Sequence, residues 1–246
     1  MNSKETIFSH LVELRDRLLR IVIGIVLTSL VLFPFANDIY YLLATPLLNS
    51  LPEGGQMIAT EVATPFLVPM KMVLLVAFLL SSPHSLYQLW AFIAPGLYTK
   101  ERNLIGPLVF SSVLLLLCGM AFAYFLVFPV VFGFLTSTAP EGVAIMTDIS
   151  RYLDFAISLF IAFGLAFETP IVVVLLVRSG FVGIKALRGA RAYVIVGAFV
   201  LGAVLTPPDI LSQFMLAIPM WLLYELGILV ANITSTKVQE IEESQF

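Results

Sequence analysis

Acidic side chains close to arginines are the clearest candidates for chemistry in this sequence, and the first of them lies near the N-terminus. Glu13 precedes Arg17 by four positions in the segment 8–18, whose apolar spacing predicts a helix. A carboxylate here can bind a guanidinium group through charge-assisted hydrogen bonds. The alternative is an amphipathic lead-in helix with a weak surface ion pair and no binding role.

A second acid, Glu101, ends the aromatic-rich segment 87–102. Phe92 and Tyr98 lie in this segment and can supply apolar walls beside the carboxylate. The competing interpretation is a belt of aromatic residues at the membrane surface, with Glu101 placed favourably at the start of the next helix. Taken with Glu13, the segment predicts a pocket for cationic groups attached to a hydrophobic stretch.

A third group of polar residues lies within apolar runs, where an ionisable side chain is costly. Glu168 lies near the middle of such a run and is followed by Pro170, which predicts a kink. Gln213 and Glu225 lie in the last apolar run, after a Pro-rich hairpin at 205–209. These groups either hold helices together or take a direct part in the function of the protein, and the sequence leaves both interpretations open.

Several other kinds of chemistry have no visible site. There is no Gly-rich loop ending in Gly-Lys-Ser/Thr, so the sequence predicts no nucleotide-binding site. His10 and His84 are the only histidines, and Cys118 is the only cysteine, which argues against a haem, a zinc site or a disulfide framework. We therefore expect no cofactor, no metal and no enzymatic activity.

The composition indicates that lipid surrounds most of the chain. Of 246 residues, 60% are hydrophobic and only 12% are charged, and the mean hydropathy is +1.02. A soluble domain of this size does not need so much apolar surface. The net charge of −3 gives no reason to expect nucleic acid as a partner.

The apolar runs predict an all-α, polytopic membrane protein with six transmembrane helices in a single integral membrane domain. A span needs about 20 apolar residues. The fifth and sixth are expected to be short, the fifth having about 14 apolar residues, or about 21 Å. An acidic, disordered tail is expected over 238–246. The six predicted spans are 18–40, 66–90, 104–136, 152–177, 192–205 and 210–231.

The positive charges predict the orientation of these spans. With the N-terminus inside, eleven of the thirteen Lys and Arg residues fall in cytoplasmic segments, and only Lys71 and Arg151 lie toward the outside. Cytoplasmic loops of membrane proteins carry such an excess of Lys and Arg. We therefore expect both termini in the cytoplasm.

Several of these segments together resemble one known family, TatC, the receptor subunit of the twin-arginine protein translocase. The resemblance extends over roughly 8–231 and weakens in the inner loop 178–191 and in the tail. The segments that carry it are 10–18, 57–61, 87–101, 138–142, 167–170 and 205–209.

The resemblance implies a receptor for signal peptides with paired arginines, in a translocase that exports folded proteins using the proton-motive force. It implies a bacterial plasma membrane location and, as partners, single-span subunits of the TatA and TatB type, other copies of itself and the lipid bilayer. Glu168 matches the family's intramembrane acid, and Gln213 matches the region where the single-span subunits dock. The implied signal-peptide-binding residues are Glu13, Glu101, Arg17, Phe92, Tyr98 and Pro46.

Two other functions remain as alternatives. A proton-coupled secondary transporter of a small solute would use Glu168 as its coupling site, but it would leave Glu13 and the Glu101 segment unexplained. The halves also lack the paired broken helices of inverted-repeat transporters. The second alternative is a membrane scaffold whose polar residues only join helices.

Overall fold

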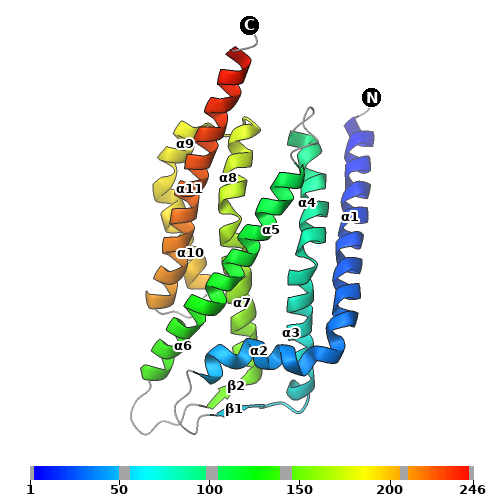
Figure 1. Ribbon diagram of the computed structural model, residues 1–246, viewed down its shortest axis with the longest axis vertical. Helices are drawn as coiled ribbons and strands as arrows, with labels where there is room; N and C mark the ends of the chain where they lie inside the picture. Colours follow the sequence, from blue (N-terminus) through cyan, green and yellow to red (C-terminus); the bar gives the residue numbers. More distant parts are fainter. Residues whose placement is uncertain (1–2, 50–55, 98–104, 139–145, 206–209, 244–246) are drawn as a thin grey trace. The chain divides into compact units, whose positions relative to one another are not determined.

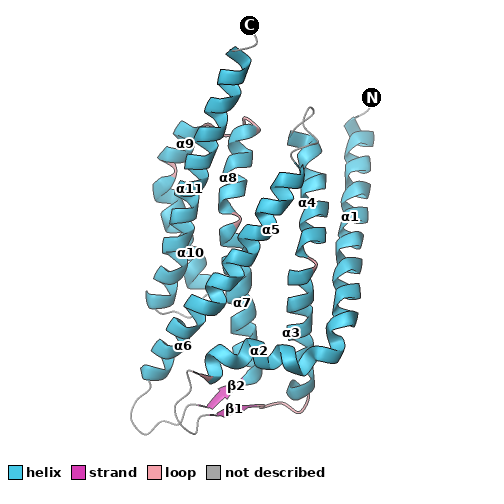
Figure 2. Cartoon of the chain, viewed as in Figure 1, coloured by secondary structure: helices cyan, strands magenta, loops and turns pink. Residues whose placement is uncertain are grey.

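The computed structural model describes residues 3–49, 56–97, 105–138, 146–205 and 210–243. Helices account for most of these residues, and two short strands for a few (Figures 1 and 2). The chain forms two compact units, which are described separately. Unit 1 contains residues 1–49, 54–114 and 146–153, and unit 2 contains 50–53, 115–145 and 154–246.

Unit 1 is built on a long N-terminal helix, α1, over Ser3–Leu32, so the predicted lead-in segment and the first apolar run form one helix. A 3-10 turn, η1 (Phe33–Phe35), joins it to α2 (Ala36–Leu48), which runs across the end of α1 in Figure 1. Helix α1 packs on α3 (Thr64–Leu80) and α4 (Ser82–Leu97), and α2 packs on α3.

The second predicted span is a bent pair of helices. Helices α3 and α4 meet at Ser81 with an angle of 56°. Pro83 in the first turn of α4 has no N–H to donate, and its ring would clash with the carbonyl group four residues earlier, so one straight helix cannot continue through it. Trp90 of α4 then donates from Nε1 to Ser112 Oγ of α5 (Ile105–Phe122) at 2.8 Å.

Two three-residue strands form a parallel sheet, which the prediction of an all-α fold did not include. Strand β1 (Gln56–Ile58) pairs with β2 (Met146–Asp148), with Met57 opposite Thr147. Asp148 fixes the junction: its Oδ2 accepts bonds from the Thr60 N–H at 3.1 Å and hydroxyl at 2.6 Å. Its Oδ1 accepts hydrogen bonds from the backbone N–H groups of Ser150 and Arg151 at the start of α7 (Ile149–Phe167).

We expect this junction to loosen in acid. The hydrogen bonds from the Thr60 hydroxyl and the Arg151 amide hold the pKa of Asp148 below its ordinary value of 3.8. A depressed carboxylate pKa contributes stability that is complete above the unfolded-state value and is lost as the pH falls through the folded-state value. Hydrogen exchange at the Thr60 and Ser150 amides, corrected for intrinsic rates, should therefore accelerate below about pH 4.

Asp148→Ala should produce the same acceleration at neutral pH and remove its acid dependence. Asp38→Ala, at an exposed acid of α2, is the matched control and should leave both amides protected. Unchanged protection in Asp148→Ala would show that the carboxylate does not hold the two segments together.

Unit 2 begins with the rest of α5, a π-helical turn η3 (Ala123–Val127) and α6 (Phe128–Ser137). The wide turn has a local cause, because Pro129 lacks the N–H that would bond to the carbonyl of Phe125. The Phe128 amide instead bonds to the Ala123 carbonyl, five residues back. The three segments form one continuous candidate span, Gly106–Phe134, in line with the predicted third run.

Helices α7 (Ile149–Phe167) and α8 (Thr169–Arg178) continue the fourth predicted span and are interrupted at Glu168. Pro170 lies in the first turn of α8, so the helix is interrupted at the point where the sequence predicted a kink. The close packing of α5 and α7 depends on Gly119, since a Cβ there would lie 2.6 Å from the Phe163 carbonyl oxygen. Phe163 itself is fully buried.

The last helices are α9 (Ile184–Gly189), α10 (Arg191–Leu205) and α11 (Ile210–Glu243). Helix α10 has 15 residues, as expected of a short fifth helix. The expectation of a short sixth helix was wrong, because α11 has 34 residues, and it continues to Glu243 through most of the segment predicted as a disordered tail. Helix α11 packs on α8, α9 and α10.

Among the described residues, four helical segments are long and apolar enough to cross a membrane, or five if the bent α3–α4 pair is one span. Helix α10 is apolar but shorter than these. The structure therefore agrees with a polytopic, mainly helical membrane protein. The four segments are Ser9–Leu48, Gly106–Phe134, Ile149–Arg178 and Ile210–Thr234.

Candidate functional site

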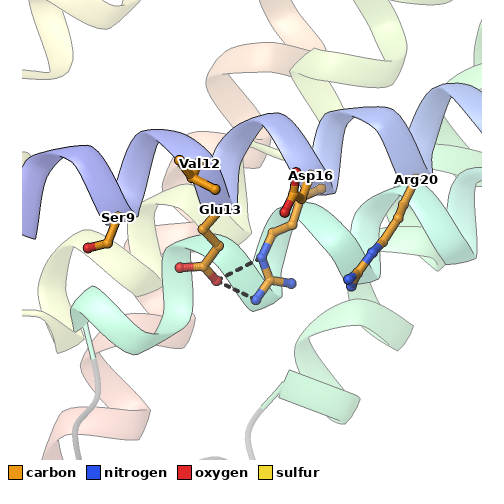
Figure 3. A pocket seen from close by; sticks show the side chains of 6 residues that line it. Ser9, Val12, Glu13, Asp16 and Arg20 are labelled. Atoms are coloured by element: carbon orange, nitrogen blue, oxygen red, sulfur yellow. Dashed lines mark hydrogen bonds and ion pairs between the residues drawn. The ribbon is translucent and has the colours of Figure 1, made fainter.

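The first candidate site is an open groove along the N-terminal part of α1, with a volume of about 330 Å³. Figure 3 shows the side chains of Ser9, Glu13 and Arg20 extending to one side of the helix. Their positions follow from the helical repeat, since residues three or four apart share a face. The groove is lined by Ser9, Val12, Glu13, Asp16, Arg17 and Arg20.

Glu13 already binds a guanidinium group in this groove. Arg17 donates to Glu13 Oε1 from Nε at 2.9 Å and from Nη2 at 2.7 Å (Figure 3). The Glu13 side chain remains 44% exposed, whereas that of Arg17 is 19% exposed. A separate pair joins Arg15 and Asp16 at 2.8 Å. The Glu13–Arg17 contact is the ion pair within one helix that the alternative interpretation predicted, and the binding of an external guanidinium group at Glu13 stays a prediction.

Helix α4 places aromatic groups next to this part of α1. Phe92 stacks on His10, one helical turn before Glu13, with ring centroids 4.4 Å apart and an interplanar angle of 15°. Further along, His84 Nε2 lies 3.3 Å from the Arg20 carbonyl oxygen. The structure thus brings Phe92 to the Glu13 end of α1, and its contact with a signal peptide stays a prediction.

His10 and His84 contact neighbouring helices, which the sequence patterns did not predict. The described residues hold no group of three or more His, Cys, Asp or Glu side chains that can bind a metal ion. Two signals in the sequence were available. His10 and Glu13 are three residues apart and therefore share a helical face, and Gly24 leaves room on α1 for the His84 ring. A Cβ at Gly24 would lie 3.0 Å from that ring.

The other predicted signal-peptide-binding residues do not join this groove in the structure. Glu101 and Tyr98 lie outside the described residues. Pro46 is buried in α2, beyond the far end of α1. Nineteen residues of α1 separate Glu13 from Leu32, or about 28 Å at the helical rise, so Pro46 does not contact a ligand in the groove.

The predicted intramembrane polar residues lie in unit 2, at helix junctions. Glu168 separates α7 from α8, and both of its carboxyl oxygens are buried. Gln213 of α11 donates from Nε2 to the Phe199 carbonyl oxygen of α10 at 2.8 Å. It packs on Gly202, where a Cβ would lie 3.1 Å from its side chain. Gln213 therefore joins α10 to α11, as expected of polar groups in apolar helices.

Glu225 has a specific partner that the sequence did not identify. Arg191, the first residue of α10, donates from Nη2 to Glu225 Oε2 at 2.7 Å, and its Nε lies 2.6 Å from Oε1. The contact is therefore an ion pair that contains one well-aligned hydrogen bond, from Nη2 to Oε2. Next to it, Tyr224 donates to the Leu187 carbonyl oxygen of α9 at 2.8 Å. These contacts fasten the 178–191 segment to α11.

The apolar helices define the chain as a multi-pass membrane protein, and buried polar groups at helix junctions are typical of that class. Comparison with known proteins gives the family: the model described as "Sec-independent protein translocase protein (TatC)" matches residues 9–219. The chain belongs to the TatC family of Sec-independent protein translocase proteins, as the sequence motifs predicted.

Curated relatives support this assignment over nearly the whole chain. The TatC protein of Haemophilus influenzae is 54% identical over 240 residues, covering 98% of this chain and 94% of the relative. That of Escherichia coli K12 is 52% identical over 239 residues, covering 97% and 93%. Both are named Sec-independent protein translocase protein TatC.

The fold is also found in solved structures of the family. A crystal structure of the twin-arginine translocase receptor TatC matches with a TM-score of 0.80 and 38% identity, covering 92% of this chain and 99% of the other. A second, determined in the detergent DDM, matches with a TM-score of 0.81. The chain is therefore a component of the Tat protein transport pathway.

Proposed function

We propose that this chain is the receptor for twin-arginine signal peptides in a translocase that exports folded proteins, driven by the proton-motive force. The observation that carries the proposal is the Glu13 contact, in which one carboxylate accepts two hydrogen bonds from a guanidinium group. A signal-peptide arginine presents the same group. The solved structure that this chain resembles is described as a twin-arginine translocase receptor.

Binding at Glu13 requires the incoming arginine to replace Arg17. The exchange costs little, because a partly exposed ion pair on one helix contributes no more than about 1 kcal/mol. The stacked Phe92 and His10 rings next to Glu13 provide an apolar surface for the hydrophobic part of a signal peptide. Glu101 and Tyr98 complete the proposed site, and Glu168 and Glu225 act elsewhere as structural polar groups.

The proposal includes the orientation and the partners. Both termini face the cytoplasm of a bacterial plasma membrane, the chain crosses six times, and no catalysis is involved. The distribution of Lys and Arg supports the orientation. The partners are single-span subunits of the TatA and TatB type and further copies of this chain, which fits the name of the family as a translocase.

Site-specific crosslinking tests the receptor proposal directly. A photoreactive phenylalanine analogue at Val12, which lines the groove, should crosslink to a twin-arginine peptide, and the yield should fall at least tenfold for the matching twin-lysine peptide. The reason is that lysine lacks the planar fork that a carboxylate binds through two hydrogen bonds. Crosslinked product is quantified on gels of inner membrane vesicles.

The control places the same analogue at Leu30, an exposed residue near the other end of α1. It should give no product that distinguishes the two peptides. Equal crosslinking of both peptides at Val12 would contradict the proposal. Proton-driven uptake of a small solute by the purified protein in vesicles would instead support the transporter alternative.

A further inference from the structure

A second surface, in unit 2, combines positive charge with exposed aromatic rings. Residues 178–191 connect α8 to α10 and contain four basic residues and no acid. Arg178 ends α8, Lys185 and Arg188 lie on α9, and Arg191 begins α10. All four therefore lie at or beyond the ends of apolar helices, the level at which lipid headgroups surround a membrane protein.

The backbone of this connection is well fixed. Gly180 has a φ of 72°, a left-handed conformation that reverses the chain after α8. The Val182 amide then bonds to the Leu176 carbonyl at 3.2 Å. Further on, Leu187 is buried against α11, and its carbonyl accepts the Tyr224 hydroxyl. The basic residues are therefore presented on an ordered support.

The two faces of α9 differ in their role. Ile184 and Leu187 pack into the apolar cluster with α8 and α11. Lys185 and Arg188 are exposed and also three residues apart, so their side chains are neighbours on the opposite side. Arg191 is occupied by its ion pair with α11. Lys185 and Arg188 are thus the cations available to an external anion.

Two exposed aromatic side chains lie next to these cations. Phe181 and Tyr193 flank the connection, with 75% and 81% of their surface exposed. Exposed aromatic residues beside basic ones are typical of the boundary between membrane and water.

We propose that residues 178–191 form a binding site for the headgroup of an anionic phospholipid. The phosphate would bind Lys185 and Arg188, while Phe181 and Tyr193 lie among the adjoining lipids. Lipid is favoured over an acidic protein segment because the cations flank apolar helix ends and exposed rings.

The purified protein in detergent, titrated with phosphatidylglycerol and separately with phosphatidylcholine, tests this site by native mass spectrometry. Wild type should bind phosphatidylglycerol more tightly. Lys185→Gln/Arg188→Gln should weaken phosphatidylglycerol binding about 30-fold, since each cation near an anionic surface contributes a factor of about five. The affinity for phosphatidylcholine should not change. Both side chains are exposed, so the fold should tolerate the change.

The control variant Lys71→Gln/Arg151→Gln removes the same charge elsewhere and should bind phosphatidylglycerol like wild type. Equal binding of the two lipids by wild type, or unaltered binding by Lys185→Gln/Arg188→Gln, would overturn the proposal. So would displacement of phosphatidylglycerol by millimolar inorganic phosphate or by an acidic peptide. Twin-arginine peptide affinity, measured in parallel, should be the same in all three proteins, so this site and the Glu13 site are tested separately.

Discussion

Glu13→Gln is expected to abolish export of a reporter protein carrying a twin-arginine signal. Glutamine keeps the size of the side chain and removes its charge, so the two charge-assisted bonds to a guanidinium group are lost while α1 remains intact. A hydrogen bond to a charged group contributes about 1.5–3 kcal/mol, so peptide affinity should fall by roughly 10- to 150-fold. Fluorescence anisotropy of a labelled signal peptide on the purified receptor measures the affinity directly.

The matched control is Glu61→Gln, the same substitution at an exposed acid between β1 and α3. It should leave both peptide affinity and export unchanged. The membrane level of each variant has to be measured as well, because lower abundance would also reduce export. Wild-type peptide affinity in Glu13→Gln would remove the groove on α1 from the binding site and would leave the family assignment intact.

Gly119→Ala adds one methyl group and is expected to lower the free energy of unfolding more than most such additions in this chain. The new Cβ would lie 2.6 Å from the Phe163 carbonyl oxygen and 3.0 Å from the Phe167 side chain. The carbonyl belongs to the backbone of α7 and cannot rotate away, so α5 and α7 must separate. Overpacking of this kind costs about 1–3 kcal/mol, and close helix contacts in membranes depend on small residues.

Gly197→Ala provides the comparison, because a Cβ there meets no atom within 4 Å. Alanine is the better helix former by about 0.5–1 kcal/mol, so this variant should be slightly more stable than the parent. Reversible unfolding in mixed micelles with increasing SDS measures both free energies. If the two variants shifted the unfolding midpoint in the same direction, the close approach of α5 and α7 would not be a determinant of stability.

Features governed by local chemistry could be predicted from the sequence. The break at Glu168 follows from Pro170, and the short α10 follows from the length of its apolar run. Pro83 carried the same signal for the bend between α3 and α4, but the continuous hydropathy of the run obscured it. The sixth helix was expected to be short because hydropathy measures apolar length, whereas α11 continues as a helix through polar residues to Glu243.

Features that depend on contacts between distant segments could not be predicted. Glu225 was predicted as a polar residue that can hold helices together. Its partner Arg191 could not be predicted, because it lies 34 residues earlier in the chain. The stacking of His10 on Phe92 requires knowing that α1 lies beside α4. The Glu13–Arg17 ion pair could be predicted because the two residues lie only one helical turn apart, while the binding of signal-peptide arginines at Glu13 stays a prediction.

The parallel pairing of β1 with β2 has a consequence for biogenesis. Thr60 and Asp148, which bond at this sheet, are 88 residues apart in the chain. At a synthesis rate of about 5–20 residues per second, β1 leaves the ribosome roughly 4 to 18 seconds before its partner exists. During that interval the young chain carries an unpaired strand, so the two segments can join only after the helices between them have been made.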